Sequence, residues 1–189
     1  MLTIAWDVDD VLNNLMEKWL EFFCHESNCV VSYEAIIKNP PCEILNITKF
    51  EYEKSLDKFR LSNEALEMQP NSEILFWMEQ YGKNFNHIAL SATSANTCCN
   101  GAYWVMKNFY KYIHSYNVVP SIRSNDGVLR PFLNKGDFIQ KVQGIDVLVD
   151  DNEQNIIDAQ KAGCRGFLVK QPWNDGMAIR DILKELAIL

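Results

Sequence analysis

Two short apolar runs in this chain each end in a pair of aspartates. The first run leads into Asp7 and Asp9, and the second, at 147–149, leads into Asp150 and Asp151. Short apolar runs bounded by turn-forming residues are typical of buried strands in a parallel sheet. Ligands bind in such sheets at the carboxyl ends of the strands. The sequence therefore predicts an α/β fold in which these acids meet at one edge of the sheet.

Acids gathered at one edge of a sheet repel one another. Two carboxylates about 5 Å apart, at an effective dielectric constant near 20, cost roughly 3 kcal/mol. A bound cation or a proton relieves this repulsion, and hard oxygen ligands suit Mg²⁺. We therefore expect a Mg²⁺ site that includes Asp7 and Asp150.

The second half of the chain alternates between apolar runs and amphipathic segments. After the first run, strands are expected at 87–90, 117–119, 147–149 and 166–169. Helices are expected at 96–112, from 135 onwards, at 153–162 and at 177–186. Five strand–helix units with short connections predict a three-layer, Rossmann-like parallel sheet.

The first and second expected strands are separated by about 70 residues, which is too many for a simple crossover. This stretch shows helical patterns at 11–23, 48–59 and 72–81 and no evident strand. We therefore expect a helical cap, residues 14–82, inserted after the first strand of a core made of 1–13 and 83–189.

Charge and composition exclude several classes of protein. A net charge of -7 argues against binding to a nucleic-acid polymer, because phosphate backbones attract basic faces. No apolar stretch approaches the roughly 20 residues that span a bilayer, and the start of the chain lacks the basic region of a secretory signal. We therefore expect a cytoplasmic protein that does not enter a membrane. Its six cysteines follow no zinc spacing and are expected to be reduced rather than paired in disulfides.

Two further residues stand where a phosphate could be held. Ser91 follows the second expected strand, where a hydroxyl and the free amides of a helix start can bind a phosphoryl oxygen. Lys135 stands at a helix start, where the helix dipole disfavours a cation unless it faces an anion. Each also has a plainer interpretation, Ser91 as a turn or cap residue and Lys135 as a solvated side chain. Likewise Asp9, Asp10 and Asp151 could simply cap helices.

The order of these residues resembles the haloacid dehalogenase superfamily. Its first motif, Asp-x-Asp-x-Thr/Val, is matched by residues 7–11, its second by Ser91, its third by Lys135 and its fourth by residues 150–151. The resemblance covers nearly the whole chain, including the size and place of the cap. In wording, the start of the chain and residues 69–71 look like the 5'-nucleotidase branch of the superfamily.

This resemblance implies a Mg²⁺-dependent phosphatase that works through an aspartyl-phosphate. Asp7 would be the nucleophile and a metal ligand, and Asp9 the general acid and base and a metal ligand through its backbone carbonyl. Ser91 and Lys135 would hold the phosphoryl oxygens. The metal would also be bound by Asp150 and supported by Asp151. Superfamily dehalogenases lack the second acid of the first motif, so Asp9 favours phosphate over halide chemistry. The residue after that acid is often Gly in relatives and is Asp10 here.

Other interpretations of the same residues stay open. The receiver domain of phosphorelays, a regulatory module, also uses strand-end acids, a hydroxyl and a lysine, but in another order and without a cap of this size. A phosphomutase shares all four motifs, and a non-catalytic relative would only bind phosphate esters. The expected partner is a small phosphorylated metabolite, with nucleoside 5'-monophosphates among the candidates. Lys83, Arg123 and Arg130 could meet a second phosphate, although a solvated face is the plainer expectation for all three.

Overall fold

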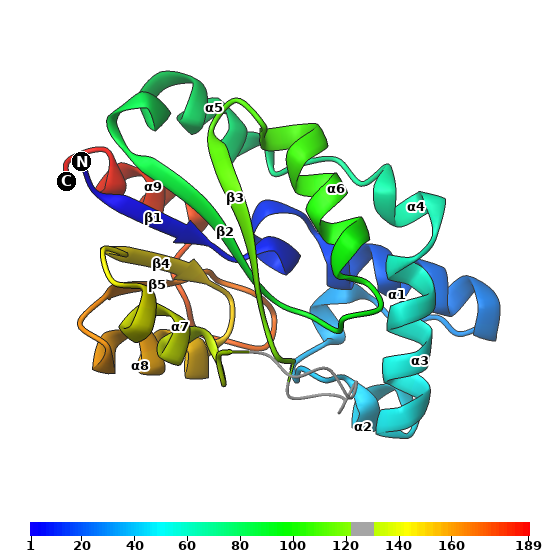
Figure 1. The fold of residues 1–189 in the computed structure, drawn as a ribbon. Helices are drawn as coiled ribbons and strands as arrows, with labels where there is room; N and C mark the ends of the chain where they lie inside the picture. The colour runs from blue at the N-terminus through cyan, green and yellow to red at the C-terminus, as the bar shows by residue number, and fades with distance from the viewer. Residues whose placement is uncertain (122–130) are drawn as a thin grey trace.

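The computed structural model describes residues 1–121 and 131–189, in which five parallel strands form one sheet in the order β3-β2-β1-β4-β5 (Figure 1). The strands are β1 (Thr3–Trp6), β2 (Asn86–Ala92), β3 (Ile113–Val119), β4 (Val147–Asp150) and β5 (Arg165–Leu168). The α-helices are α1 (Leu15–Ser27), α2 (Cys42–Leu45), α3 (Lys49–Arg60), α4 (Asn63–Leu66), α5 (Ser72–Tyr81), α6 (Cys98–Phe109), α7 (Lys135–Val142), α8 (Glu153–Lys161) and α9 (Ile179–Leu186). Short π or 3-10 turns are formed by Val8–Leu12, Tyr33–Ala35 and Gly82–Asn84. Within the described ranges, no helix combines the length and apolar character needed to cross a membrane.

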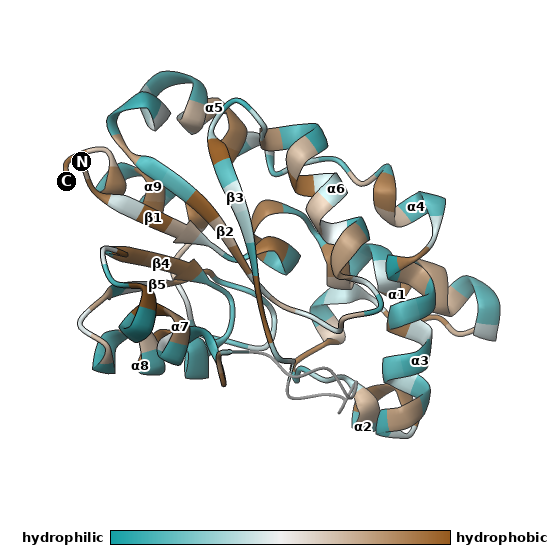
Figure 2. Cartoon of the chain, in the orientation of Figure 1, coloured by the Kyte–Doolittle hydropathy of each residue, from teal (hydrophilic) through white to brown (hydrophobic). Residues whose placement is uncertain are grey.

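The sheet is covered by helices on both faces, as a three-layer α/β fold requires. On β1, Ile4 and Trp6 belong to the core that includes α5, α6 and α9, whereas Ala5 belongs to the core beneath α7 and α8. Side chains alternate between faces along a strand, so both faces of β1 are buried. The apolar colour of the central strands in Figure 2 follows from this double burial. The predicted fold class is confirmed.

The expected cap, residues 14–82, is not uniform in its packing. Helices α1 to α4 extend beyond the carboxyl ends of the strands, whereas α5 lies beside the sheet near both termini (Figure 1). In α5, the Trp77 ring lies 6.1 Å from the rings of both Trp6 and His87 on the sheet. Where the inserted unit begins and ends therefore stays a prediction.

Several element boundaries differ from the expected ones by one to three residues, and the starts of two elements differ by four. The helix predicted from residue 11 begins only at Leu15, because Asp9 is extended and Asp10 has a φ of 61°. Aspartate tolerates this left-handed conformation better than most residues, which explains how Asp10 stands where relatives often have Gly. Strand β3 begins at Ile113 rather than at 117, because it lies at an edge of the sheet and can expose polar side chains such as His114.

The expectation that all six cysteines are reduced is wrong for one pair. Cys24 and Cys29 form a disulfide, with their Cα atoms 4.6 Å apart. Cys24 lies in the last turn of α1, and the left-handed Asn28 turns the chain back so that the Cys29 amide donates to the Cys24 carbonyl. This helix end brings the two side chains together. Neither zinc-site spacing nor adjacency in sequence indicates such a pair.

Candidate active site

The structure brings Asp7 and Asp150 together at the carboxyl edge of the sheet. Strands β1 and β4 are neighbours, with Trp6 beside Val149, and the Asp7 amide donates to the Val149 carbonyl at 2.9 Å. The chain leaves β1 towards β2 on one side and returns through β4 on the other, so this is the point where the strand order reverses. Ligands bind in open α/β sheets at such a point.

Lys135 joins the two acids. Its Nζ atom lies 2.7 Å from Asp7 Oδ1 and 2.6 Å from Asp150 Oδ2, and the side chain is fully buried. Burial opposes its charge, but Asp150 and Asp7 outweigh that effect and raise the pKa of Lys135. A Cβ atom on Gly136 would lie 2.7 Å from Asp158 Cβ, so this glycine allows the start of α7 to approach α8 closely. The interpretation of Lys135 as a solvated side chain is therefore wrong.

Asp150 and Asp151 differ in how their oxygens are used. Both Asp150 oxygens accept hydrogen bonds, from Lys135, from the Asn152 amide at 2.9 Å and from Asn155 Nδ2 at 3.0 and 3.1 Å. Asp151 accepts from Trp173 Nε1 at 3.2 Å. The cap of the helix after this strand is Asn152 rather than Asp151, since the Asn152 side chain accepts from two amides of α8. Asp151 is thus less committed to hydrogen bonds than Asp150.

Carboxylate oxygens of Asp7, Asp150 and Asp151 lie within 4.8 Å of one another. Burial raises the pKa of Asp7 to about 7, in spite of the opposing charge of Lys135. Burial and the charges of Asp10 and Asp150 raise the pKa of Asp151 well above its usual range. Such buried carboxyl groups ionise more readily when a positive charge lies beside them. Their hard oxygen donors and close spacing fit a divalent cation such as Mg²⁺.

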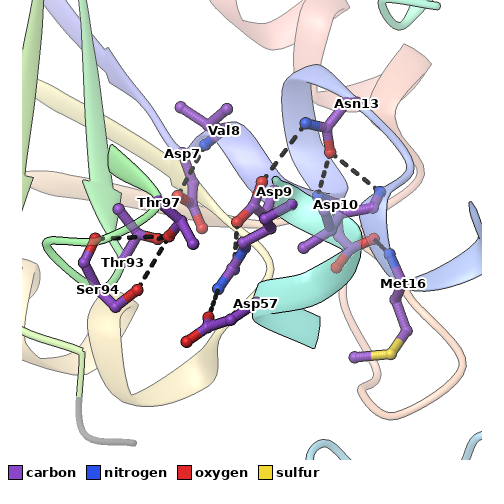
Figure 3. Close-up of polar contacts among 12 residues, drawn as sticks. Asp7, Val8, Asp9, Asp10, Asn13, Met16, Asp57, Thr93, Ser94 and Thr97 are labelled. Atoms are coloured by element: carbon purple, nitrogen blue, oxygen red, sulfur yellow. Dashed lines mark hydrogen bonds and ion pairs between the residues drawn. The ribbon is translucent and has the colours of Figure 1, made fainter. Parts of the chain in front are cut away.

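Asp10 is more deeply embedded than its interpretation as a helix cap predicted. It is 6% exposed and accepts a hydrogen bond from the Met16 amide at 2.8 Å (Figure 3). Burial, reinforced by the charges of Asp9 and Asp7, raises its pKa to about 8. Asp10 therefore does support the start of α1, while adding a fourth acid to the same edge. We call Asp7, Asp10, Asp150 and Asp151 the acid cluster.

The Asp9 carboxylate is not part of the group of three clustered carboxylates and is paired instead with an arginine of α3. It accepts a hydrogen bond from Arg60, at the end of α3, at 2.5 Å, and lies 3.4 Å from Asn13 Nδ2. Its side chain is 24% exposed. The structure therefore separates the side chain of Asp9 from the predicted metal site and does not test its backbone carbonyl as a ligand.

Ser91 lies at the carboxyl end of β2, beside β1, and is buried. Its hydroxyl is hydrogen-bonded to that of Tyr116 on β3. A cavity of about 100 Å³ is lined by Ser91, Asp7, Asp9 and Asp151, among others. Four of the sequence-predicted residues thus line one small space, whereas Lys135 and Asp150 are not among its lining residues.

The hydroxyls just after Ser91 form a separate group. Thr93 Oγ1 and Ser94 Oγ each lie 3.0 Å from Thr97 Oγ1 (Figure 3). These contacts close the turn that leads into α6.

Some residues at the site were missed, and others expected near it are elsewhere. Arg60 and Asn155 were not predicted as site residues, because the sequence shows only that they belong to amphipathic helices. The partner of Arg60 is Asp9, which is distant in sequence, and that of Asn155 is Asp150, across the turn before α8. Lys83 is exposed at the turn that precedes β2, at the opposite edge of the sheet. Arg123 and Arg130 lie outside the described residues.

No protein-family model and no curated protein matches this chain, but solved structures match it over nearly its full length. A haloacid dehalogenase-like family hydrolase from Streptococcus pneumoniae has a TM-score of 0.65 at 10% identity, with 96% of this chain and 90% of that chain covered. A predicted phosphatase from Clostridium acetobutylicum has a TM-score of 0.64 at 12% identity, with 100% and 99% covered. The putative hydrolase YfnB from Bacillus subtilis, solved bound to magnesium, has a TM-score of 0.59 at 12% identity, with 100% and 99% covered.

This chain has the haloacid dehalogenase fold. The resemblance predicted from four motifs is thus matched by the arrangement of the whole chain. In this fold the motif residues follow adjacent strands and begin α7, so the fold itself accounts for their convergence.

Proposed function

We propose that this protein is a Mg²⁺-dependent phosphatase that hydrolyses a small phosphate monoester through an aspartyl-phosphate on Asp7. One observation carries the proposal. The Asp7 carboxylate ends β1 beside Lys135, with oxygens of Asp150 and Asp151 close by. A nucleophilic carboxylate at the edge of a sheet, next to a cation and a candidate metal site, suits attack on a phosphoryl group.

In the first step, Asp7 Oδ forms a bond to phosphorus and the bond from phosphorus to the ester oxygen breaks. The leaving oxygen takes a proton from the Asp9 carboxyl. In the second step, a water attacks the phosphorus and gives its proton to Asp9. The bond from Asp7 to phosphorus then breaks, which releases inorganic phosphate and restores both side chains.

Mg²⁺ would be held by Asp7, by Asp151 and by the backbone carbonyl of Asp9, with Asp150 as a further acid of the site. Asp151 is favoured as a direct side-chain ligand because Asp150 already accepts hydrogen bonds on both oxygens. When bound, the cation would neutralise negative charge on the phosphoryl oxygens.

Lys135 and Ser91 would act on the phosphoryl group from two sides. The Lys135 ammonium orients Asp7 and supplies positive charge beside it. The Ser91 hydroxyl lines the cavity that Asp7 also lines, and it can donate to a phosphoryl oxygen.

The leaving group is proposed only as a class. Nucleoside 5'-monophosphates are candidates because of the wording of the first motif, alongside sugar phosphates and other small esters. A small-molecule partner and a cytoplasmic location belong to the same proposal. A phosphomutase would return an isomerised ester, and a binding protein would return the ester unchanged.

The test is release of inorganic phosphate from a panel of such esters, with and without Mg²⁺. Steady release that needs Mg²⁺ is expected, and Asp7→Asn should lower its rate by about 10³-fold or more, because the nucleophile is lost. Asp181→Asn, on the exposed face of α9, is the matched control and should leave the rate unchanged. Near-normal turnover by Asp7→Asn, or an isomerised ester in place of free phosphate, would contradict the proposal.

A further inference from the structure

Arg60 connects the helical segment beyond the sheet to the proposed general acid. It is the last residue of α3, and its side chain is 8% exposed. Its guanidinium donates to Asp9 Oδ2 at 2.5 Å and lies 4.0 Å from Asp57 Oδ1. In Figure 3, dashed lines join Asp9 and Asp57 to the guanidinium between them. The backbone carbonyl of Arg60 accepts a separate hydrogen bond, from Asn100 Nδ2 of α6 at 3.1 Å.

These contacts fix the end of α3 at two points. The bond from Asn100 holds the Arg60 main chain to the helix that covers the sheet. The guanidinium can therefore move about its own side-chain bonds while the backbone stays in place. A change of partner by this side chain requires no rearrangement of α3.

Arg60 also faces the space in which the substrate would bind. It lines the cavity of about 100 Å³ together with Asp7, Asp9, Ser91 and Asp151. Among the described residues that line this cavity, four are aspartates and Arg60 is the only cation. A phosphoryl group that enters this cavity meets four aspartates and one arginine.

Carboxylates and phosphates compete for the same guanidinium geometry. Arginine presents five N–H donors in a rigid fork that fits either anion. The Asp9 carboxylate is partly exposed, so an entering anion can reach its ion pair with Arg60. A dianionic phosphoryl group offers more negative charge than one carboxylate.

We propose that Arg60 exchanges partners when the phosphoryl group binds. In the protein without substrate, Arg60 neutralises Asp9. When a phosphoryl group enters, the guanidinium turns to a phosphoryl oxygen and leaves the Asp9 carboxyl free to face the ester oxygen. This inference rests on the proposed function and gives Arg60 two roles, binding the phosphoryl group and controlling the position of Asp9.

The first test is binding of inorganic phosphate, measured by calorimetry on the full chain with saturating Mg²⁺. Arg60→Gln should weaken phosphate binding by about 10-fold, because a charge-assisted hydrogen bond is lost. Arg60→Lys keeps the charge without the fork and should lie between Arg60→Gln and the unchanged protein. Arg180→Gln is the matched control, since Arg180 is exposed and pairs only loosely with Glu73 at 3.7 Å.

The second test needs no variant and stands even if Arg60→Gln does not fold. A crystal structure with Mg²⁺ and phosphate should place the guanidinium on a phosphate oxygen, with the bond from Arg60 to Asp9 broken. Phosphate binding unaffected by both Arg60 variants would overturn the exchange. So would a phosphate complex in which the pair with Asp9 is intact.

The exchange and the proposed function can fail separately. If the unchanged protein releases phosphate from esters and Asp7→Asn does not, but the Arg60 pair persists in the phosphate complex, only the exchange is overturned. If no ester is hydrolysed although phosphate displaces Asp9 from Arg60, the exchange stands and the proposed hydrolysis is overturned.

Discussion

Two groups of buried polar side chains both adjoin strand β1, one around His87 of β2 and the other the acid cluster after β1 and β4, and their environments differ. At one, His87 is 1% exposed, Trp6 Nε1 donates to its Nδ1 at 3.0 Å, and its Nε2 donates to the Gly82 carbonyl at 3.0 Å. Both ring nitrogens are partnered without any charge, among the aromatic rings of Trp77 and Phe85.

At the carboxyl ends of the strands, the acid cluster is only partly compensated. Lys135 pairs with two of its members, yet the pKa of Asp7, of Asp10 and of Asp151 is still raised. Burial of polar groups stabilises a fold when every group has a partner, and leaves a need for a ligand when groups do not. The difference between the two regions favours a structural role for His87 and makes the acids the candidates for function.

The largest loss of stability is expected on removal of Lys135, the cation of the acid cluster. Lys135→Met should lower the free energy of unfolding by about 3–5 kcal/mol in the absence of Mg²⁺, because it leaves buried carboxylates without their cation. Urea unfolding at pH 8 measures this, since Asp7 ionises above about 7. Lys141→Met removes an exposed lysine of the same helix, paired with Asp137 at 2.9 Å, and should leave stability unchanged. Equal losses of stability in the two variants would show that the buried ion pairs of Lys135 contribute no more than the exposed pair of Lys141.

The contribution of His87 to the free energy of unfolding should depend on pH. Burial lowers the pKa of His87 from its ordinary 6.5 to about 4, so the unfolded chain takes up a proton before the folded protein does. The stability that neutral His87 contributes is complete above pH 6.5 and is lost as the pH falls towards 4. The loss amounts to at most about 3 kcal/mol.

His87→Gln isolates this contribution, since it cannot titrate while the acid cluster is unchanged. Unfolding free energies measured from pH 7 to pH 4 should fall more steeply for the unchanged protein than for the variant. Parallel profiles for the two proteins would mean that His87 has the same pKa in the folded and the unfolded protein, which contradicts the lowered value.

The smallest expected effect comes from the cation. Mg²⁺ at 100 times its dissociation constant should stabilise the fold by about 2.7 kcal/mol and raise the melting temperature. Asp151→Asn should reduce this gain, because it removes a proposed ligand, whereas Asp181→Asn should not. Identical melting shifts in all three proteins would argue against a metal site at the acid cluster.

The place of the motif residues could be predicted because it depends on local pattern. The apolar runs before Asp7 and Asp150 fixed where two buried strands end, and parallel neighbours bring such ends to one edge. Ser91 follows from the same rule. The site of Lys135 was harder, since a lysine at a helix start has two interpretations until its partners are known.

Other features depend on contacts that the sequence does not mark. The Arg60 pair joins residues 51 apart, and the bond from Trp173 to Asp151 joins a loop after β5 to the end of β4. Asp10 appeared to be a simple cap until its burial was known. The Cys24 and Cys29 disulfide depends on the left-handed turn at Asn28.

Short-range pattern in the sequence was enough to predict a parallel α/β sheet with acids, a hydroxyl and a lysine at one edge, because such pattern sets strand ends and helix starts. It could not predict which carboxylate oxygens are hydrogen-bonded, which acids pair with Lys135 and Arg60, or how deeply each side chain is buried. Those properties come from the packing of helices far apart in the chain, and packing sets the desolvation and the Coulomb energy of every charge at the site.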